Sequence, residues 1–403
     1  MSESVPHFSY FAGSRVHLGL TGSVACYRVL DLCRSLVGAD MGVSACLTKA
    51  AGKFVTPLSL RALGADPVRE AFFQGTEQAF PHLEPGQQTE ALLVAPASAD
   101  FLAKMACGLA DDLLSCQVLA HPGPVIAAPA MNPKLWHAMA TQANVATLRE
   151  RGIRVLEPES GDVACGETGR GKLPGLGEIY LQLLKALAPQ DMQGLSVLVT
   201  MGPTREYLDP VRYWSNPSSG KMGAAVATAA WLRGARVYCV SGPSDVDLPG
   251  EVERYNVQSA REMYSRCLEL WPGMDAACLC AAVCDLRPAE PRENKLKKED
   301  LPQEETSISF ARNPDILLSL GRDKGKAQKL VGFAAETDSD LHQAASSKLE
   351  GKNLDLILAN RVSSDGTGFA SDTNQVLFLD RKGAASEQKG SKGDIAWRLW
   401  DWI

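Results

Sequence analysis

The chain has 403 residues and a formal net charge of −6. This length exceeds that at which a single hydrophobic core usually keeps growing, so we expect two domains of about 200 residues each. The sequence has no basic stripe interleaved with aromatic residues, no apolar run of about 18 residues and no signal-peptide core, so we expect no nucleic-acid partner, no membrane partner and a cytoplasmic location.

Apolar runs alternate with helical patterns between residues 15 and 185. Continuous apolar strands are buried on both faces, which indicates a parallel sheet covered by helices. The predicted strands are RVHLGLTGS (15–23), GVSACLTKA (42–50), EALLVAPASAD (90–100), PVIAAPAMN (124–132) and RGIRVLEPES (151–160). The segment KALAPQDMQG (185–194) then breaks the pattern and predicts a domain boundary.

A second series of apolar strands follows this break. Its members are LSVLVTMGPT (195–204), GARVYCVSGPS (234–244), DAACLCAAVCDL (275–286), KLVGFAAET (329–337), NLDLILANRV (353–362) and NQVLFLDRKG (374–383). The charged stretch PRENKLKKEDLPQEE (291–305) is predicted to be a loop. We therefore predict two doubly wound, Rossmann-like α/β domains, residues 1–189 and 190–403, with ligands at the carboxyl ends of their strands.

Small and hydroxyl residues follow three predicted strands of the first half. Thr21, Gly22 and Ser23 stand at the first strand-to-helix turn, where free backbone amides and the helix dipole favour a phosphate. The same three residues also fit an ordinary tight turn. Thr48 and Ser98 follow the next two strands. Because no acidic residue ends the second strand, the set favours a mononucleotide over NAD.

Three other residues of the first half are candidates for chemistry. Asn132, in PAMNPKLW, follows a buried strand and fits either a functional residue or a simple helix cap. His82 precedes the third strand and is eligible as a base, because histidine side chains in general exchange a proton near neutral pH, although a lone histidine is more often a surface or packing residue. Cys165 lies on the glycine-rich segment SGDVACGETGRGKL, which suits thiol chemistry. None of the 11 cysteines forms a C-x-x-C pair, so we expect no structural zinc or disulfide frame.

The stretch SNPSSGKMG (215–223) precedes a long alanine-rich segment that is predicted to be a helix. It is not a Walker loop, because Ser215 stands where that motif needs glycine and Met222 follows Lys221. Its small residues and its lysine fit an anion site at a helix N-terminus. They also fit a serine-capped helix that packs on a sheet, and the pattern alone favours this second reading.

Taken together, the motifs point to a known pair of families. GSVACYR, the His82-Leu83 pair, APASADFLAKMACGLADDLLS, PAMNPKLW and ACGETGRGKL occur in this order, and with them the first half resembles the flavin-dependent phosphopantothenoylcysteine decarboxylases. The second half is similar to the phosphopantothenate–cysteine ligases through GPTREYLDPVRYWSNPSSGKMG, AAVCDLRP, NKLKK, NPDIL, GFAAET and NLDLILANRV. The likeness covers nearly the whole chain. It implies the fused bacterial enzyme of coenzyme A biosynthesis, with a flavodoxin-like flavoprotein domain followed by a ligase domain.

The resemblance implies FMN as the cofactor of the first half. In that family the substrate's terminal cysteine is oxidised to a thioaldehyde, CO₂ is lost, and the resulting enethiol is reduced again. His82 would assist the oxidation, Asn132 would orient the substrate carboxylate, and Cys165 would protonate the enethiol. The FMN contacts would be Gly22, Ser23, Thr48 and Ser98.

For the second half, the resemblance implies that a nucleotide is transferred to the carboxylate of 4′-phosphopantothenate and then displaced by L-cysteine. Asn216 would hold the acyl group or its phosphate, Asp285 would ligate Mg²⁺, and Lys295 would close over the reacting phosphorus. The other nucleotide contacts would be Ser218, Ser219, Gly220, Lys221, Pro314, Asp315, Ile316, Leu317, Phe333, Lys348 and Lys352. Without the family, the NKLKK run fits a solvated charge cluster, Phe333 a core residue, and the last two lysines a helix surface.

The resemblance also implies CTP as co-substrate, because the fused enzymes use it, although the residues themselves do not distinguish CTP from ATP. It implies a homo-oligomer of trimeric flavin domains, in many members joined into dodecamers by ligase dimers. The chain departs from the family pattern at several positions that carry no assigned chemistry, namely Cys107, Asp111, Leu135, Arg170 and Lys172.

Two other functions were weighed. A flavoprotein that decarboxylates the C-terminal cysteine of a peptide would have a similar first half, but it would lack the second half with Asp285 and Lys295. A non-catalytic flavin-binding scaffold is disfavoured because His82, Asn132 and Cys165 are retained. A turnover assay separates this scaffold from an enzyme.

Overall fold

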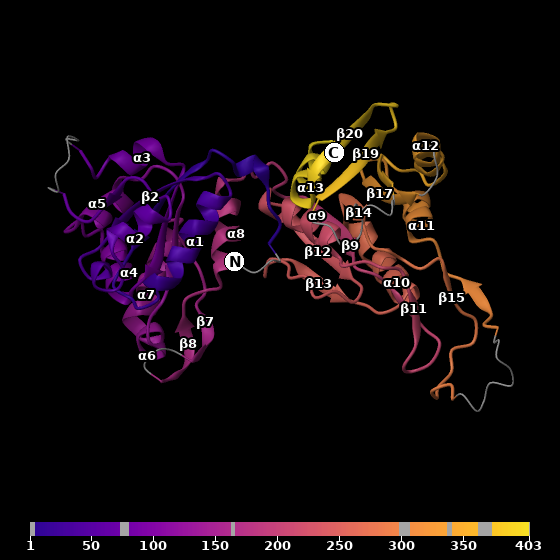
Figure 1. The fold of residues 1–403 in the computed structure, drawn as a ribbon, viewed down its shortest axis with the longest axis horizontal. Coiled ribbons are helices and arrows are strands. Elements are labelled where there is room, and N and C mark those ends of the chain that lie inside the picture. Colours follow the sequence, from indigo (N-terminus) through magenta and orange to yellow (C-terminus); the bar gives the residue numbers. More distant parts are fainter. Residues whose placement is uncertain are drawn as a thin grey trace. The chain divides into compact units, whose positions relative to one another are not determined.

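The computed structural model describes residues 5–72, 80–162, 166–297, 307–336, 341–361 and 373–402 (Figure 1). The chain forms two compact units, and each is described by itself below. Residues 9–189 form the first domain, and residues 190–403 together with Pro6–Phe8 form the second. None of the described helices is both long enough and apolar enough to span a membrane.

The sequence alone assigned Pro6–Phe8 to the first domain, but they pack with the second. The ring of Phe8 meets that of Trp397 edge-on, with ring centroids 6.0 Å apart. The hydroxyl of Ser391 donates a hydrogen bond to the carbonyl oxygen of His7 (2.9 Å). These contacts join segments nearly 400 residues apart in the chain, which no local sequence pattern reports.

The first domain is built on a six-stranded parallel sheet with the order β3-β2-β1-β4-β5-β6. The order reverses between β1 and β4, which is the switch point of a doubly wound fold. Without the two-residue edge strand β3, the order is that of flavodoxin. The strands are β1 (Arg15–Leu20), β2 (Gly42–Leu47), β3 (Val68–Arg69), β4 (Ala91–Ala97), β5 (Val125–Pro129) and β6 (Arg154–Val155), and a separate hairpin pairs β7 (Glu159–Asp162) with β8 (Thr168–Lys172).

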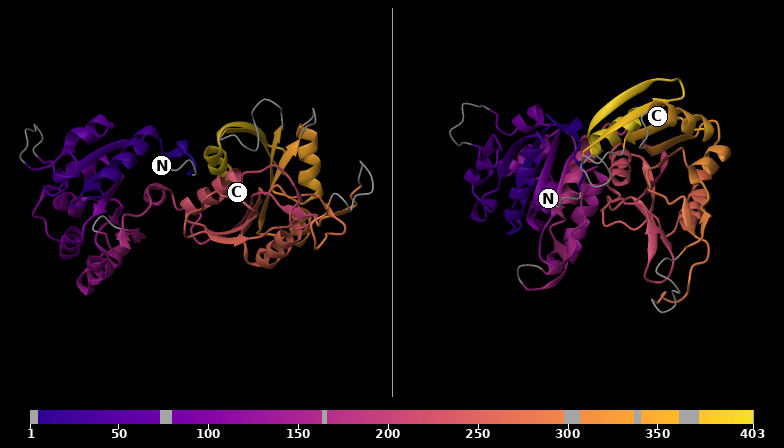
Figure 2. Two further views of the ribbon diagram at one scale, coloured as in Figure 1. Left: turned by 60° about the horizontal axis from the view of Figure 1, so that its bottom comes forward. Right: turned by 45° about the vertical axis from the view of Figure 1, so that its right-hand side comes forward.

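Helices cover both faces of this sheet (Figures 1 and 2). Helices α1 and α8 pack together on one face, and α4, α5 and α7 pack on the other. The helices of this domain are α1 (Cys26–Gly38), α2 (Pro57–Ala62), α3 (Glu84–Gln88), α4 (Ala99–Cys107), α5 (Leu113–Ala120), α6 (Pro133–His137), α7 (Met139–Glu150) and α8 (Leu176–Leu187), with 3₁₀ turns at Ser9–Phe11 and Ala51–Lys53.

The local sequence explains these elements. β4 is buried at every position, as its continuous apolar run predicts for a central parallel strand. α1 buries Val29, Leu32, Cys33 and Leu36, which lie on one face of a helix. The predicted α/β class with a parallel sheet is confirmed for this domain.

One polar group lies in the middle of this apolar sheet. The ring of His17, on β1, is fully buried, with Nδ1 2.8 Å from Ser44 Oγ and Nε2 3.0 Å from Gln117 Oε1. Burial lowers the pKa of His17 from 6.5 to about 4; the hydrogen bond to Gln117 acts against this shift, and the charges of His121 and Arg69 add to it. At neutral pH the ring is therefore uncharged.

The second domain has an eight-stranded sheet with the order β13-β12-β9-β14-β17-β18-β19-β20. The first six strands of this order are parallel, and β19 and β20 are antiparallel to their neighbours. The sheet strands are β9 (Ser196–Met201), β12 (Arg236–Ser241), β13 (Glu253–Asn256), β14 (Ala276–Leu279), β17 (Lys329–Glu336), β18 (Leu356–Arg361), β19 (Thr373–Asp380) and β20 (Ala385–Ser391).

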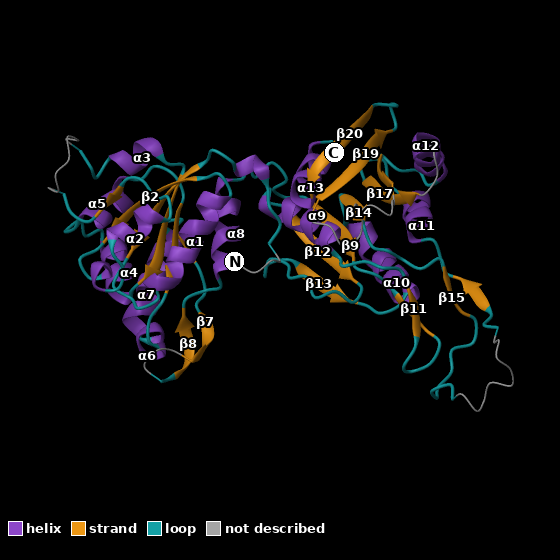
Figure 3. Cartoon of the chain, in the orientation of Figure 1, coloured by secondary structure: helices purple, strands orange, loops and turns teal. Residues whose placement is uncertain are grey.

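Helices cover both faces of the second sheet as well. α9 and α13 pack together on one face, and α10, α11 and α12 cover the other. The helices are α9 (Lys221–Leu232), α10 (Ala260–Leu270), α11 (Ile316–Asp323), α12 (Leu341–Gly351) and α13 (Lys392–Asp401), with a 3₁₀ turn at Trp271–Gly273. Two hairpins lie outside the main sheet (Figure 3), namely β10 (Arg205–Tyr207) with β11 (Tyr213–Ser215) and β15 (Leu286–Pro288) with β16 (Phe310–Arg312).

The sequence predicted most of the second sheet, with two differences. The strand predicted over 275–286 is wrong in its extent, since β14 ends at Leu279. Beyond it, Ala282 pairs only with Pro203, and the Cys284 amide donates to Thr204 Oγ1 (3.0 Å). β13 and β20 were not predicted, because their residues are polar and largely exposed and so carry no apolar run.

We expect the substitution His17→Leu to flatten the pH dependence of the first domain's stability. The pKa of His17 lies near 4 in the folded chain and near 6.5 in the unfolded chain. As the pH falls from 6.5 to 4, the unfolded chain therefore binds a proton at this residue that the folded chain does not bind. This group should therefore lower the free energy of unfolding by about 3 kcal/mol between pH 6.5 and pH 4, and should contribute nothing to pH dependence above that range.

Urea unfolding at several pH values in this window measures the effect. His137→Leu is the matched control, because His137 is exposed in the same domain. An identical pH slope in the wild-type protein and in His17→Leu would contradict the expectation.

Candidate active sites

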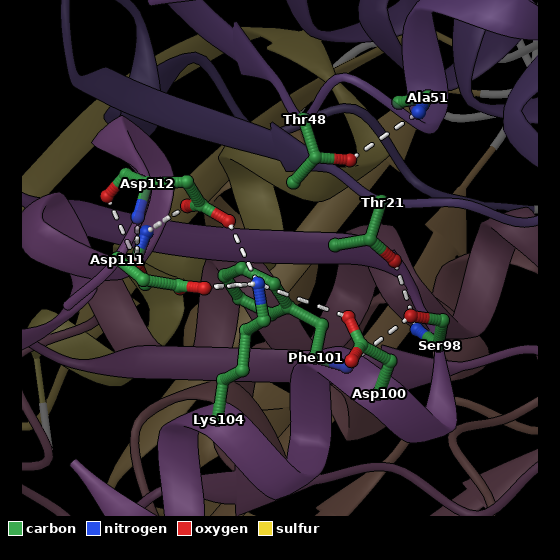
Figure 4. Close-up of polar contacts among 10 residues, drawn as sticks. Thr21, Thr48, Ala51, Ser98, Asp100, Phe101, Lys104, Asp111 and Asp112 are labelled. Carbon is green, nitrogen blue, oxygen red and sulfur yellow. Dashed lines mark hydrogen bonds and ion pairs between the residues drawn. The ribbon is translucent and has the colours of Figure 1, made fainter. Parts of the chain in front are cut away.

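The carboxyl ends of β1, β2 and β4 bring together hydroxyl groups from three separate segments (Figure 4). Thr21 is 1% exposed, and its Oγ1 donates to the carbonyl oxygen of Pro96 (2.6 Å) and accepts from the amide of Ser98 (2.8 Å). Thr21 thus cross-links the ends of β1 and β4 at the switch point. It holds the site together rather than presenting its hydroxyl to a ligand.

Around this cross-link lies a cavity of about 730 Å³, lined among others by Gly22, Ser23, Thr48 and Ser98. Ser98 Oγ accepts from the amide of Phe101 at the start of α4, and Thr48 Oγ1 accepts from the amide of Ala51 (both 3.3 Å). Because a hydroxyl that accepts one hydrogen bond still has a proton to donate, each can also bind a phosphate or flavin oxygen. All four predicted flavin contacts therefore share one cavity.

Gly22 is required by a close approach of two loops. A Cβ atom at this position would lie 2.7 Å from the Cβ atom of Ala50. The turn after β1 thus packs at Gly22 directly against the methyl group of Ala50 in the segment after β2, and any larger side chain at position 22 would force the two segments apart. Gly22 therefore allows the close packing of these two segments, in addition to leaving the backbone amides of the predicted phosphate turn accessible.

One departure from the family pattern, Asp111, has a definite contact (Figure 4). Lys104 lines the cavity, and its Nζ lies 3.0 Å from Asp111 Oδ1, 3.3 Å from Asp112 Oδ2 and 4.0 Å from Asp100 Oδ2. The hydrogen bond from Lys104 to Asp111 is the main cause that raises the pKa of this lysine. The cavity therefore holds a permanently charged cation whose position is fixed by carboxylates.

Asn132 both caps a helix and lines the cavity. Its Oδ1 accepts from the amide of Lys134 at the start of α6 (2.8 Å), and its Nδ2 donates to Glu167 Oε2 (2.8 Å). Lys134 Nζ holds the other oxygen of the same carboxylate at 2.6 Å. Hydrogen bonds from Lys134 and then from Asn132 lower the pKa of Glu167. The helix-cap reading is therefore confirmed, and the functional role of Asn132 stays a prediction.

The β7–β8 hairpin is tied to this segment. The amide of Met131 donates to the carbonyl oxygen of Gly171 (2.9 Å), and a Cβ atom at Gly171 would lie 2.3 Å from Met131 O. A second cavity, of about 320 Å³, lies against the hairpin and shares Asn132 with the first. In the sequence, Cys165 falls between the residues of β7 and those of β8, and it is outside the described residues.

His82 is not brought to these cavities within one chain. It precedes α3, which leads into the amino end of β4, whereas Asn132 follows the carboxyl end of the parallel strand β5. Figure 1 shows α3 and α6 toward opposite ends of the domain. The ring of His82 lies 6.1 Å from that of Phe72 and 6.3 Å from that of Phe80, and His82 does not line either described cavity.

In the second domain a cavity of about 380 Å³ opens at the carboxyl ends of the parallel strands. It is lined by every predicted nucleotide contact except Lys295: Asn216, Ser218, Ser219, Gly220, Lys221, Asp285, Pro314, Asp315, Ile316, Leu317, Phe333, Lys348 and Lys352. Five separate segments of the second domain thus converge on one cavity. Their roles in nucleotide binding stay predictions.

The loop before α9 is shaped by its own backbone. Gly220, the residue before α9, has a φ of +83°, and a Cβ atom there would lie 2.5 Å from Ser244 Oγ. Ser218 Oγ accepts from the Gly220 amide (3.3 Å). Asn216 Nδ2 donates to the carbonyl oxygen of Val283 (3.0 Å), which ties this loop to the segment that carries Asp285. The amino end of α9 therefore faces the cavity in a fixed geometry.

The two lysines on α12 are paired with carboxylates. Lys348 Nζ contacts Glu336, and Lys352 Nζ lies 2.8 Å from Asp315 Oδ2. Asp315 also caps α11, because its Oδ1 accepts from the amide of Leu318 (2.9 Å). These contacts hold both ammonium groups at the cavity wall instead of leaving them on the solvent side of the helix.

Lys295 does not line this cavity. Its neighbour Leu296 is buried, with its amide donating to Asp209 Oδ2 (3.1 Å) and its carbonyl accepting from Arg212 Nη2 (3.0 Å). Lys295 itself is exposed. The loop is therefore anchored beside the β10–β11 turn, and a role for Lys295 in the reaction remains a prediction.

Several residues that line this cavity were not predicted from the sequence, among them three with an amide or ammonium side chain. Asn360 lies near the end of β18, Asn374 near the start of β19, and Lys392 at the start of α13, where it is 7% exposed. Asn360 could have been predicted, since it occupies the same strand-end position as the other candidates. Lys392 could not have been predicted from the sequence, because only the antiparallel pairing of β19 with β20 returns the chain to this edge of the sheet.

Known proteins share both halves of this architecture. Residues 9–187 match the family model described as Flavoprotein, and residues 192–403 match the DNA/pantothenate metabolism flavoprotein C-terminal domain. The chain is 40% identical to the coenzyme A biosynthesis bifunctional protein CoaBC of Vibrio vulnificus, with 96% of each chain covered. It is 42% identical to that of Haemophilus influenzae (95% of each chain) and 41% identical to that of Escherichia coli (92% of this chain and 94% of the relative).

Among solved structures, the chain is similar to the C-terminal domain of a CoaBC protein (34% identity, TM-score 0.45), which covers 53% of this chain and 95% of that one. The fold and the two family models define a two-domain flavoprotein of pantothenate metabolism. More narrowly, the chain belongs to the family of the coenzyme A biosynthesis bifunctional proteins CoaBC. The predicted resemblance is confirmed, and so is the assignment as an enzyme with a decarboxylase half and a ligase half.

We expect Thr21→Val to destabilise the first domain by about 1–3 kcal/mol, because it leaves two buried backbone groups at the β1–β4 junction without their partner. Urea unfolding measures this loss. Thr21→Ser is the matched variant, since it keeps the hydroxyl and removes only a methyl group. A Val variant as stable as the Ser variant would contradict the assigned cross-link.

Proposed function

We propose that the second domain joins 4′-phosphopantothenate to L-cysteine with CTP, and that the first domain decarboxylates the product to 4′-phosphopantetheine with FMN. The observation that carries the proposal is the convergence of the assigned nucleotide contacts on one cavity. A second cavity in the other domain, lined by the assigned flavin contacts, supports two successive reactions on one metabolite. We also propose that both reactions take place in the cytoplasm.

In the ligase reaction, a carboxylate oxygen of 4′-phosphopantothenate attacks the α-phosphorus of CTP and pyrophosphate leaves. The amino group of L-cysteine then displaces CMP and forms the amide. The amide groups at the start of α9, with Ser218, Ser219 and Lys221, receive phosphate oxygens, since unpaired helix N–H groups and a cation favour negative charge there. CTP rather than ATP is proposed on the likeness to the fused relatives alone.

The residues present fit a magnesium ion of the nucleotide-bound kind. Among the described residues, no group of three His, Cys, Asp or Glu side chains could hold a metal ion by itself. Asp285 is exposed and lines the cavity. Mg²⁺ usually takes one or two carboxylates together with substrate phosphates and water, so Asp285 would supply the single protein ligand.

The first cavity fits FMN by its chemistry, because hydroxyls, backbone amides at two helix starts and the fixed cation Lys104 surround it. When bound, FMN supplies the hydride acceptor and donor for the oxidation and later reduction of the substrate. Asn132 orients the substrate carboxylate. In this chain its Nδ2 already donates to the carboxylate of Glu167, so the substrate's carboxylate would take the place of Glu167 there.

His82 acts, in this proposal, at a site completed by a second copy of the chain. The support is geometric, since His82 does not line the cavities that hold Asn132 within one chain. A homo-oligomer of the flavin domain, trimeric as the resemblance implies, would supply His82 from a neighbour. Cys165, which protonates the enethiol, completes the assignment.

Incubating the protein with FMN, 4′-phosphopantothenate, L-cysteine, Mg²⁺ and either CTP or ATP tests the whole proposal. We expect CMP, CO₂ and 4′-phosphopantetheine with CTP, and much less product with ATP. Asp285→Asn should abolish CMP release, yet still release CO₂ when 4′-phosphopantothenoylcysteine is added directly. Asn132→Ala should do the reverse. Loss of both products in both variants would show misfolding and not the assigned division of labour.

We further propose that Lys392 binds the anionic co-substrate 4′-phosphopantothenate, because this cationic residue is 7% exposed and lines the cavity, where its ammonium group can donate a charge-assisted hydrogen bond to an anionic ligand. Lys392→Met should raise the KM for 4′-phosphopantothenate on the order of 10-fold, since one charged hydrogen bond is typically worth about 1.5–3 kcal/mol. The KM for CTP should change little. Lys389→Met is the matched control, because Lys389 is exposed on β20 three residues earlier. Equal effects of the two substitutions would overturn the assignment.

A further inference from the structure

A chain of buried polar contacts runs from the centre of the first sheet to the segment that carries His82. Ser44 Oγ lies 2.8 Å from His17 Nδ1, and His17 Nε2 lies 3.0 Å from Gln117 Oε1. Gln117 Nε2 in turn donates to the carbonyl oxygen of Pro81 at 3.0 Å. Gln117 is 1% exposed and His17 is 2% exposed. This chain of polar contacts thus ends on Pro81, the residue directly before His82.

The direction of each hydrogen bond in this chain of polar contacts follows from its last acceptor, the carbonyl oxygen of Pro81. A carbonyl oxygen only accepts, so the Gln117 amide must turn its NH₂ group toward Pro81 and its oxygen toward His17. His17 must then carry its proton on Nε2. Since burial keeps the ring neutral, Nδ1 is an acceptor, and the Ser44 hydroxyl donates to it. Every member therefore has one defined orientation.

A second buried contact fixes the other side of the same segment. Arg69, on β3, makes an ion pair with Glu84, the first residue of α3, and both side chains are 11% exposed. Pro81 and Glu84 flank His82 in the chain. Its backbone is thus held from the sheet through β3 and from α5 through Gln117.

We propose that Gln117, oriented by His17, is a positioning residue that sets the place of His82 for the oxidation step of the decarboxylase. The inference rests on the role proposed above for His82. An apolar pair at positions 17 and 117 would fill the same space without a desolvation cost. The polar pair instead supplies one directional bond to the Pro81 carbonyl, which an apolar pair cannot make.

The substitution Gln117→Met tests this inference in the full-length chain with FMN. We expect kcat for decarboxylation of added 4′-phosphopantothenoylcysteine to fall at least 10-fold with a KM within 2-fold of the wild-type value. Amide hydrogen exchange of the described residues 80–88, measured on the protein without FMN, should increase. Gln182→Met is the matched control, because Gln182 is 4% exposed on α8 and also makes two side-chain hydrogen bonds, to Arg154 and Glu178, neither of which leads to His82.

The double variant His17→Leu/Gln117→Leu separates positioning from stability. It removes both partners of the buried hydrogen bond but also the acceptor of the Ser44 hydroxyl, so the melting temperature should recover in part relative to the single Gln117 variant. Turnover should stay low, because Pro81 still lacks its donor. Recovery of kcat together with the melting temperature would overturn the inference, as would an unchanged kcat in Gln117→Met.

A reference variant keeps this test distinct from that of the proposed function. His82→Asn should lower kcat at least as much as Gln117→Met does. Full activity of His82→Asn would refute the proposed role of His82, and with it this inference. Low activity of His82→Asn beside normal activity of Gln117→Met would refute only the positioning role of Gln117.

Discussion

The parallel pairing of the central strands is the constraint on which both sites depend. Parallel strands all end at the same edge of a sheet, and their backbone groups beyond the last ladder bond need other partners. In the first domain Thr21 satisfies two of these groups at the junction of β1 and β4. In the second domain Asn216 and Thr204 do the same for the segment after β14. Each site is built on polar groups that the fold itself has to satisfy.

This constraint explains why so much of the sites could be predicted from sequence. Thr48 and Ser98 in the first domain, and Asp285 in the second, stand at the ends of apolar runs that are recognisable as strands. Their places at the strand-end edges of their own sheets therefore follow from the parallel topology of each domain. Ser218 precedes, and Lys221 begins, a helix that is apolar around most of its circumference and therefore must be buried. The places of such residues can be predicted from local sequence patterns and from one rule of sheet topology.

The remaining residues depend on contacts that no local pattern reports. Lys392 reaches the cavity only because β20 pairs with β19, and β20 is too polar to be recognised as a strand. His82 was recognised by its motif, yet its place relative to Asn132 follows from which end of which strand each one adjoins. Lys295 is displaced from the cavity by the burial of its neighbour Leu296 against Asp209. In each case a long-range contact decides the position.

Capping a helix and lining a cavity are not alternatives in this protein. Ser98, Asn132 and Asp315 each accept a backbone amide at a helix start, and each also lines a cavity. A cap fixes the side chain in one rotamer, which lowers the conformational entropy that a ligand contact would otherwise cost. The same logic extends, in our proposal, to the buried His17–Gln117 pair, whose hydrogen bond to the Pro81 carbonyl would constrain the segment that carries His82. A sequence criterion that separates structural from functional polar residues would therefore misassign the residues on which these sites depend.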